Sequence, residues 1–590
     1  MNVVAISFQI HSKGDFFMEF HITGGNRNAK ITLDHQSEQD GILSFDVNLS
    51  LPQEEIPETF RISFEFPIVD IYSTWGPAFG ANRELGPNWS KRVTRSRLAS
   101  FLPLHSLLSV DSKNRLTIAL SDAKTPTSIA TGVCEETAKM ECVIAFFTEK
   151  VAPLQTYTAT VRLDTRDIPF YDSLYDVVAW WKDALGYPEA YVPEHARLPI
   201  NSLWYSYHQA LDVEDILREC ELSRPLGMHT VIVDDGWQTD DGNRGYSFCG
   251  DWEVAASKIP DMKDFVARVH ATGMKFMLWY SVPFVGKHAK NYEKFKDMLL
   301  DNPNAKADTW ALDVRYKEVR DFLVNTYVTA VKEWGLDGLK LDFIDSFVLY
   351  GKSLENDPRR DYQSLEDAID VLMTEITQSL KAINPEILIE FRQSYVGPAI
   401  RKYGNMLRVG DCPNDAIMNR QGVLNLRFTS GSIPVHSDML LWNFDDPVEV
   451  AALQLVSVLY SVPQISVKIA QMPADHKKML TYYLAFWREY RDVLLDGKVT
   501  AENPESAYSS ACSQLGGRAV VTVYTDTVVD GGKFCETVVV NGSKKPLLLK
   551  NAAGRSYRVV NCMGEELTAG TVPADLIELA VPTSGMVFVK

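Results

Sequence analysis

Acidic residues stand at the ends of several apolar runs in the central part of the chain. HTVIVDD ends in Asp234 and Asp235, GLKLDF contains Asp342, MLRVGD ends in Asp411, and SIPVHSD ends in Asp438. One such Asp is commonly a helix cap or a turn residue. Four run ends that share the feature indicate that carboxylates converge on one site, where a pair could act as nucleophile and acid.

Aromatic residues accompany these acids. Trp237, Trp252 and Trp279 lie beside them in the sequence, and capping would not require them. A sugar site uses aromatic faces for apolar C–H surfaces and carboxylates for hydroxyl donors. The combination predicts carbohydrate chemistry.

Lys340 and Asp342 define the candidate nucleophile. They are two residues apart in an apolar run, so strand alternation places them on the same side. A nearby lysine would keep Asp342 ionised, as a nucleophile requires, while Asp411, kept protonated by an apolar or anionic setting, would protonate the leaving oxygen. The alternative is a structural Lys340–Asp342 ion pair. His436 and Asp438 have two open roles, substrate contact or hydrogen bonding to the next loop.

These residues need a scaffold that gathers them at one face, and the chain between residues 198 and 496 predicts one. Apolar strand-like runs alternate there with amphipathic helical segments, which indicates repeated βα units around a parallel sheet. Eight units predict a (β/α)8 barrel, whose reacting groups come from the C-terminal ends of the strands. The candidate strands are INSLWYS, HTVIVDD, KFMLWYS, GLKLDF, ILIEFR, MLRVGD, SIPVHSD and PQISVK.

The flanking segments read as β domains. Residues 1–169 contain short alternating runs separated by turn signals, which predicts an N-terminal β-sandwich. Residues 170–197 have apolar spacing typical of a linking helix, and residues 497–590 return to short β runs that predict a small C-terminal antiparallel β-sandwich. The expected fold is therefore multidomain α/β, with a central (β/α)8 barrel between two β domains.

Charge and composition exclude several classes of function. The 590 residues carry a formal charge of -18, which argues against nucleic acid or an anionic membrane surface as partner. No run approaches the ~20 apolar residues that span a bilayer. The start lacks a basic and then apolar leader, so we expect a cytoplasmic protein, although a signal removed beforehand would leave no trace.

Cofactor and metal motifs are missing from the sequence. The eight cysteines are dispersed without zinc-ligand spacing, and neither a GxGxxG after a strand nor an HExxH occurs. We expect reduced thiols, no metal, and chemistry that needs no cofactor.

Several motifs, in order, resemble the α-galactosidases of glycoside hydrolase family 36 and, more remotely, family 27. They are DDGW at Asp234, GDW at Gly250 followed by KIP at Lys258, GMKFMLW at Gly273, LDVRYKEVRDFL at Leu312, DGLKLDF at Asp337 and GDCPND at Gly410. The resemblance implies a barrel followed by a β domain, and the N-terminal β domain points to family 36.

The resemblance also implies roles for individual residues. Asp342 looks like the family nucleophile and Asp411 like the acid/base of a retaining mechanism, which would place their carboxyl groups roughly 5 to 5.5 Å apart. Asp234 and Asp235 would hold O4 and O6 of galactose, and Lys340 would bond ring hydroxyls. Trp252 would line the pocket, and we place Trp279, Arg392 and Arg408 at the substrate too. A carbohydrate is the implied partner, and self-association into a homo-oligomer is a further implication.

The chain departs from the family pattern inside the expected pocket. Residues 279–283 read WYSVP where the family tends to carry WxEPE, and residues 390–398 read EFRQSYVGP where it has CxSGGGR. Arg392 is thus a candidate for the lost contact with O2, or for a different substituent, including a charged one. The acid/base motif has one extra residue, which leaves Asp415 as the alternative to Asp411. Arg408 precedes Asp411 by three positions rather than the four of family 27, so its inward orientation stays open.

Three functions follow, in order of support. The first is a retaining α-galactosidase that removes terminal α-galactosyl residues. The second keeps the barrel and aspartates but changes the sugar or acceptor, as in an α-N-acetylgalactosaminidase, a β-L-arabinopyranosidase or a raffinose-synthase-like transglycosylase. The third is a glycan-binding protein without turnover.

Overall fold

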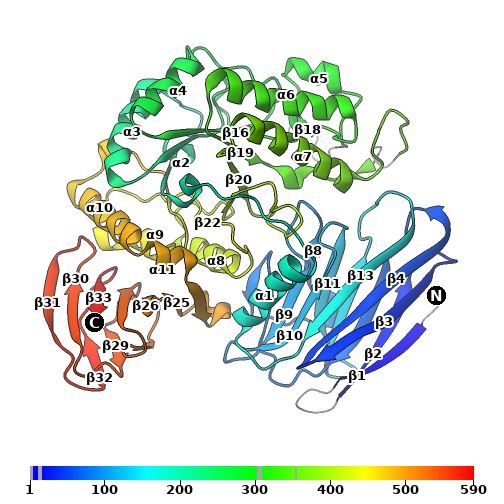
Figure 1. Ribbon diagram of the computed structural model, residues 1–590, viewed down its shortest axis with the longest axis horizontal. Coiled ribbons are helices and arrows are strands. Elements are labelled where there is room, and N and C mark those ends of the chain that lie inside the picture. Colours follow the sequence, from blue (N-terminus) through cyan, green and yellow to red (C-terminus); the bar gives the residue numbers. More distant parts are fainter. Residues whose placement is uncertain (1–3, 11–15, 302–307, 352–354) are drawn as a thin grey trace.

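The computed structural model describes residues 4–10, 16–301, 308–351 and 355–590. In Figure 1 the barrel lies in the upper part of the view, with the N-terminal β domain below it on the right and the C-terminal β domain below it on the left. The expected multidomain α/β architecture is confirmed. No helix in these ranges is both long and apolar enough to cross a membrane.

The barrel is a parallel sheet of eight strands. Pairing runs in the order β22-β21-β20-β19-β16-β15-β14-β23, and a parallel bridge from His436 in β22 to Val462, two residues before β23, closes the barrel. All eight strands coincide with the runs expected from the sequence. They are β14 (Ile200–Ser202), β15 (Thr230–Val233), β16 (Lys275–Ser281), β19 (Gly338–Asp342), β20 (Leu388–Arg392), β21 (Met406–Arg408), β22 (Val435–His436) and β23 (Gln464–Ile465).

Helices cover most of the outer face of the barrel. Several begin with a side-chain cap: Asp212, Asp261 and Ser364 each accept a hydrogen bond from a backbone N–H three residues later. The principal helices are α3 (Val213–Leu226), α4 (Met262–Ala271), α6 (Lys317–Trp334), α7 (Leu365–Ile383), α8 (Ala416–Arg427), α9 (Val448–Ser457) and α10 (Ala474–Glu489). Shorter ones are α2 (Trp204–Tyr207), α5 (Lys290–Phe295) and α11 (Arg491–Asp496).

The fifth βα unit differs from the expected pattern. Turns, and no helix, connect β20 to β21 in this described stretch. The N-terminal domain packs there instead: Phe101 N donates to Ser394 O at 2.6 Å, and a Cβ on Gly397 would lie 2.6 Å from Phe101 O. The neighbouring domain therefore covers the place where a helix would pack.

Two antiparallel sheets form the N-terminal β domain. Buried and more exposed residues alternate along β4 and β5, and the buried ones belong to a hydrophobic core that is separate from that of the barrel. One sheet consists of β1 (Val4–Ile10), β2 (Phe16–Gly24), β5 (Phe60–Phe66), β12 (Lys139–Phe146), β11 (Thr127–Cys134) and β8 (Arg92–Ser96). The other consists of β3 (Lys30–Gln39), β4 (Ile42–Glu55), β13 (Leu154–Asp164), β10 (Asn114–Leu120), β9 (Leu104–Leu108), β6 (Ser73–Gly76) and β7 (Gly80–Asn82). After β13 the chain enters α1 (Phe170–Ala179), which packs against β10.

The C-terminal β domain has a sheet of seven strands and one of three. Most pairs are antiparallel, but β26 pairs in parallel with β28, and β27 with β29, so the domain is mixed rather than purely antiparallel. The larger sheet holds β24 (Lys498–Glu502), β25 (Ser510–Leu515), β26 (Arg518–Val523), β28 (Glu536–Asn541), β33 (Met586–Val589), β30 (Ser556–Val560) and β31 (Glu566–Thr571). The smaller holds β27 (Val528–Asp530), β29 (Leu547–Lys550) and β32 (Leu576–Leu579).

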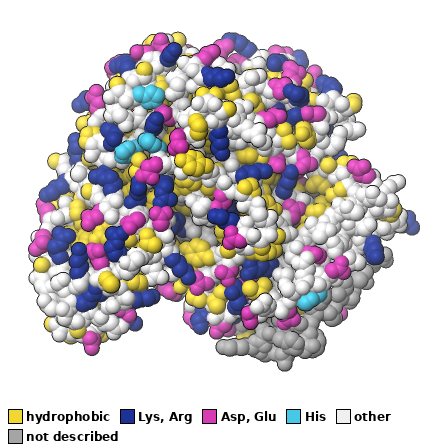
Figure 2. Space-filling view, in the orientation of Figure 1, with side chains coloured by type: hydrophobic (Ala, Val, Ile, Leu, Met, Phe, Trp, Pro, Cys, Tyr) yellow, Lys and Arg dark blue, Asp and Glu magenta, His cyan; other side chains and the backbone are white. Residues whose placement is uncertain are grey.

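The charged residues do not segregate on the face shown in Figure 2. Basic and acidic side chains are interspersed across it, with apolar patches between them. The net negative charge thus produces no single acidic surface in this view.

Candidate active site

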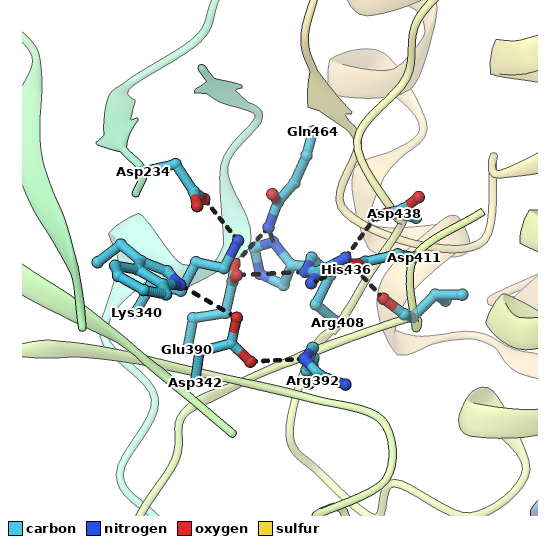
Figure 3. Close-up of polar contacts among 12 residues, drawn as sticks. Asp234, Lys340, Asp342, Glu390, Arg392, Arg408, Asp411, His436, Asp438 and Gln464 are labelled. Carbon is cyan, nitrogen blue, oxygen red and sulfur yellow. Dashed lines mark hydrogen bonds and ion pairs between the residues drawn. The ribbon is translucent and has the colours of Figure 1, made fainter. Parts of the chain in front are cut away.

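Asp342 ends β19 at the mouth of the barrel, where donors surround its carboxylate (Figure 3). Arg392 Nε donates to Oδ1 at 2.5 Å and the backbone N–H of Phe343 donates to the same oxygen at 2.8 Å. The Tyr395 hydroxyl lies 3.2 Å from Oδ1. Trp279 Nε1 donates to Oδ2 at 3.0 Å. Oδ1 is therefore crowded, and Oδ2 keeps a lone pair.

The charge of Asp342 is set by a balance of burial and cations. Burial raises its pKa, but Arg392, Lys340 and the indole donor of Trp279 outweigh burial and lower the pKa to about 2. Arg392 in turn lies over the Phe343 ring, 4.9 Å from its centroid. Asp342 is thus ionised at any physiological pH, as a nucleophile requires.

Lys340 has a different partner from the one considered in the sequence. Its Nζ donates to Asp234 Oδ2 at 2.6 Å, and both side chains are buried. Burial lowers the pKa of Lys340, but the carboxylates of Asp234, Glu390 and Asp342 outweigh it and raise the pKa. Lys340 therefore forms its ion pair with Asp234 and not with Asp342. The positive charge of Lys340 still lowers the pKa of Asp342 from a distance.

Asp235 is held by two amides that sequence reasoning missed. Gln209 Nε2 donates to it at 2.8 Å and Gln238 Nε2 at 2.7 Å. Burial, with a contribution from the Asp234 charge, raises the pKa of Asp235 to about 6 despite these donors. Gln238 follows the DDGW motif directly, so its position was a usable signal, whereas Gln209 lies in the loop after β14 and carried none.

Arg408 points inward and joins three strand ends. Its Nη2 donates to Asp411 at 2.9 Å, its Nη1 donates to Asp438, and its Nε lies 3.4 Å from Glu390 Oε1. The side chain is 1% exposed. The orientation left open by the three-residue spacing is thus inward, and Figure 3 shows Arg408 between the three acids.

Asp411 lies in a more open setting than the sequence led us to expect. Its side chain is 56% exposed and contacts Arg408. Partial burial and the nearby Asp342 charge raise its pKa, but Arg408 and Lys340 outweigh them and lower it. An apolar or anionic environment that keeps it protonated is therefore not what surrounds it in the free protein. The expected setting was wrong because Arg408 turns inward.

Asp415 has a structural task. Its Oδ1 accepts hydrogen bonds from the backbone N–H groups of Ile417 and Met418, at 3.1 and 2.9 Å, and so caps α8. This contact favours Asp411 over Asp415 as the candidate acid.

His436 and Asp438 are embedded in hydrogen bonds within the protein. His436 Nε2 lies 2.8 Å from Ala196 O, and burial lowers the pKa of His436 to about 4. Asp438 accepts from Tyr205 OH at 2.9 Å and from Cys412 N at 2.7 Å. These contacts support the structural role for both residues.

The three tryptophans form an aromatic cluster beside Asp342. Trp252 packs on Trp237 and Trp279 with ring centroids 6.1 and 6.2 Å apart, and on Tyr280 at 5.0 Å. Trp252 is 6% exposed and Trp279 1%. Trp279 therefore acts on Asp342 through its N–H rather than by offering a ring face, and the sugar contact of Trp252 stays a prediction.

The mouth thus combines an ionised buried carboxylate, a second, accessible carboxylate, and buried polar groups suited to hydroxyls. Such a set can carry out nucleophilic and acid–base chemistry on a sugar. Within the described residues, no group of three or more His, Cys, Asp or Glu is arranged to hold a metal ion.

Comparisons with known proteins agree on one family. Residues 189–412 match the family model described as Melibiase. An α-galactosidase of Lactobacillus acidophilus is 33% identical over 129 residues, which is 21% of this chain and 16% of that protein. A bifunctional α-galactosidase/sucrose kinase of Mediterraneibacter gnavus is 27% identical over 175 residues, 28% of this chain and 18% of that protein. The matched segment thus spans less than a fifth of these relatives.

Solved structures extend the likeness of fold to the whole chain. The galactosidase domain of an α-galactosidase–sucrose kinase superposes with a TM-score of 0.64 at 13% identity, covering 100% of this chain and 86% of that one. A family 36 α-galactosidase of Geobacillus stearothermophilus in complex with raffinose gives 0.63 at 14% identity, covering 97% and 83%. The barrel segment 189–412 is therefore similar to the melibiase family of glycoside hydrolases, and the whole chain shares its fold with solved α-galactosidases.

Proposed function

We propose that this protein is a retaining, exo-acting α-galactosidase that hydrolyses terminal α-D-galactosyl residues. The observation that carries the proposal is the state of Asp342, a buried carboxylate at the end of β19 whose pKa is lowered to about 2 by Arg392, Lys340 and Trp279. The matching relatives, which are named α-galactosidases, support the choice of sugar.

The hydrogen bonds around Asp342 assign the attacking atom. Oδ1 accepts from Arg392 and Phe343 and lies near the Tyr395 hydroxyl, whereas Oδ2 accepts from Trp279. Oδ2 attacks the anomeric carbon, and a covalent β-glycosyl enzyme forms. Because Arg408 and Lys340 lower the pKa of Asp411 in the free protein, Asp411 first takes up a proton from solvent. It then gives this proton to the leaving oxygen and afterwards takes one from the water that releases the sugar.

The polar groups below the mouth bind the sugar. Asp234 and Asp235 accept from the galactose hydroxyls, and Lys340, which is fixed against Asp234 at 2.6 Å, donates to a neighbouring one. Their burial makes each hydrogen bond strong, because solvent does not compete there.

A changed sugar is the second candidate, and one observation favours it. In the loop that replaces the family's glycine-rich segment, Arg392 and Tyr395 both contact the nucleophile. Side chains thus occupy space beside the sugar that glycine would leave open. A substituent at the galactose 2-position would meet this loop first.

A panel of aryl glycosides tests the proposal, led by the α-D-galactoside and including the α-N-acetylgalactosaminide and the β-L-arabinopyranoside. Galactoside turnover that Asp342→Asn abolishes would support both mechanism and specificity. Turnover on another sugar alone would mean that the Arg392 loop selects a different substrate. A silent panel would contradict the proposal and favour glycan binding without catalysis.

A further inference from the structure

A turn of the N-terminal β domain reaches the mouth of the barrel. It consists of residues 97–101, directly after β8, and is closed by hydrogen bonds from Arg97 N to Ser100 O and from Ser100 N to Arg97 O, each 3.0 Å long. This domain turn contacts two barrel loops, residues 343–347 after β19 and residues 393–397 after β20. Both loops carry groups that hold the carboxylate of the candidate nucleophile, so the turn lies one step away from it.

Arg97 makes the contact with the first loop. It is 5% exposed, and its two terminal nitrogens donate to backbone carbonyls: Nη1 to Phe347 O at 2.6 Å and Nη2 to Asp345 O at 2.7 Å. Its Nε lies 3.8 Å from Glu149 Oε1, within the same domain. Because both barrel acceptors belong to the main chain, Arg97 fixes the path of the backbone there rather than one side chain. A guanidinium suits this task, since its rigid fork holds two acceptors at once.

The backbone that Arg97 holds begins in an unfavourable conformation. Phe343 follows the nucleophile directly and has a φ of +64°, in the left-handed region that a bulky side chain disfavours. In this conformation its N–H donates to Asp342 Oδ1 at 2.8 Å. One short turn follows, in which Ser346 N donates to Phe343 O at 2.8 Å. Such a conformation persists only where the surrounding structure fixes it, and Arg97 binds the carbonyls at the far end of this turn.

The second loop is tied to the same domain turn. Phe101 N donates to Ser394 O at 2.6 Å, and the hydroxyls of Ser100 and Ser394 lie 3.3 Å apart. The Ser394 hydroxyl also donates to Asp345 Oδ2 at 2.9 Å, which joins the two loops to each other. Tyr395 follows directly, and its hydroxyl lies 3.2 Å from the nucleophile. The domain turn and the two loops thus form one hydrogen-bonded unit beside the candidate nucleophile.

We propose that Arg97 is a positioning residue for the nucleophile Asp342. By holding the carbonyls of Asp345 and Phe347, it keeps the Phe343 N–H on Oδ1 and so presents Oδ2 to the anomeric carbon. The inference rests on the proposed function, in which Oδ2 is the attacking atom. Arg97 acts through the main chain and not on the sugar. The N-terminal β domain thereby serves the reaction, because it supplies the contact that orients a group on the barrel.

Arg97→Met tests the proposal, because methionine fills similar space and donates no hydrogen bond. We expect kcat on an aryl α-galactoside to fall about 10²-fold, the scale of a reacting group displaced by about 1 Å. KM should stay unchanged, so kcat/KM should fall by the same factor, which marks an interaction that matters in the transition state. Arg97→Lys keeps the charge and a donor group, and it should restore part of kcat. A rise in KM with unchanged kcat would overturn the proposal.

Arg162→Met is the matched control. Arg162 belongs to the same domain, is 7% exposed, and donates through Nη1 to the backbone carbonyl of Asp176 on α1 at 3.0 Å. Its replacement removes a comparable buried bond at a place where the acceptor is not one of the two barrel loops. The kcat of the folded control should equal that of the wild type. If Arg162→Met lowered kcat as much as Arg97→Met does, a general loss of structure would explain both, and the proposal would be wrong.

A second nucleophile separates positioning from a general structural effect. In Asp342→Ala rescued by azide, the carboxylate that Arg97 orients is gone. The addition of Arg97→Met to this background should therefore change the rate of β-galactosyl azide formation by no more than about twofold, against about 10²-fold beside the intact carboxylate. Equal losses in both backgrounds would mean that Arg97 only supports the fold, which would overturn its positioning role.

Hydrogen exchange distinguishes a failure of this inference from a failure of the proposed function. In Arg97→Met, the backbone amides of residues 343–347 should exchange faster, because two of the bonds that hold their segment are lost. Arg162→Met should leave these amides at the wild-type rate. Unchanged exchange in Arg97→Met would overturn the inference. Faster exchange in a protein that hydrolyses no galactoside would instead overturn the proposed function, while the hold of Arg97 on the loop would stand.

Discussion

The two candidate catalytic carboxylates occupy opposite kinds of surroundings. Asp342 is 10% exposed and accepts hydrogen bonds from a guanidinium, an indole and a backbone N–H. Asp411 is 56% exposed and is held by Arg408. The former lies on a barrel strand, and the latter lies three residues after one.

The difference matches the tasks proposed for the two groups. A nucleophile must stay ionised and in one place, which fixed donors in a buried setting achieve. An acid/base must lose and regain a proton in each cycle, which requires access to water and substrate. The two aspartates are chemically identical, and their surroundings distinguish them: fixed donors hold Asp342 in place, whereas Asp411 is exposed to water.

Removal of the buried carboxylate should have the largest effect. We expect Asp342→Ala to lower galactoside turnover by ~10⁴-fold or more, the scale of a deleted nucleophile. External azide should restore part of the activity and yield the β-galactosyl azide, since the shortened side chain leaves room for a small nucleophile on the face where Asp342 acts. Product analysis by NMR checks the anomer. A folded variant that azide does not rescue would contradict the assignment.

Removal of the exposed carboxylate should have an effect that depends on the leaving group. For Asp411→Ala, a loss of about 10² to 10⁴-fold is expected on substrates with poor leaving groups, such as melibiose. Activated aryl galactosides should lose far less, because they depart without a proton. A plot of log kcat/KM against leaving-group pKa measures this dependence. Equal losses on both classes would move the role away from Asp411.

Loss of Arg392 should make the buried carboxylate respond to pH. Burial raises the pKa of Asp342, and Arg392 is the strongest of the influences that lower it to about 2. In Arg392→Gln, the pKa of Asp342 should rise. As the pH is lowered, Asp342 should then become protonated, and activity should be lost, at a higher pH than in the wild type.

The pH profile of kcat/KM measures that change, and Arg392→Lys is its control. The lysine keeps a positive charge, so the acid limb of the Arg392→Lys profile should lie at a lower pH than that of Arg392→Gln. Coincident acid limbs in wild type and Arg392→Gln would show that Arg392 does not set the ionisation of Asp342.

The smallest effect should come from Asp415. Because it caps α8, Asp415→Ala should lower the free energy of unfolding by about 1 kcal/mol. The kcat/KM of Asp415→Ala should depend on the leaving-group pKa as in the wild type, in contrast to that of Asp411→Ala. Thermal unfolding and the same substrate series measure the two quantities. A selective loss on poor leaving groups would assign the acid/base role to Asp415.

Much of the fold could be predicted from local pattern. The eight barrel strands were visible because each is a short apolar run between helical segments. Strands β6 and β9 were not expected, because they are fully buried without alternation and include polar residues. His105 in β9, for example, bonds Thr94 in β8 and Thr131 in β11, two strands of the facing sheet, at 3.0 and 2.9 Å. Such polar pairs form across strands, so periodicity along one strand does not reveal them.

The sequence by itself determined the barrel and the candidate acids, because both depend on short-range order along the chain: apolar periodicity, and an acid at a strand end. The tertiary structure alone decided the partners. Lys340 bonds Asp234, which follows β15, rather than its neighbour Asp342; Arg392 bonds Asp342, and Arg408 turns inward to Asp411. Ion pairing depends on distances of a few ångströms between separate strands, and closure of the barrel sets those distances.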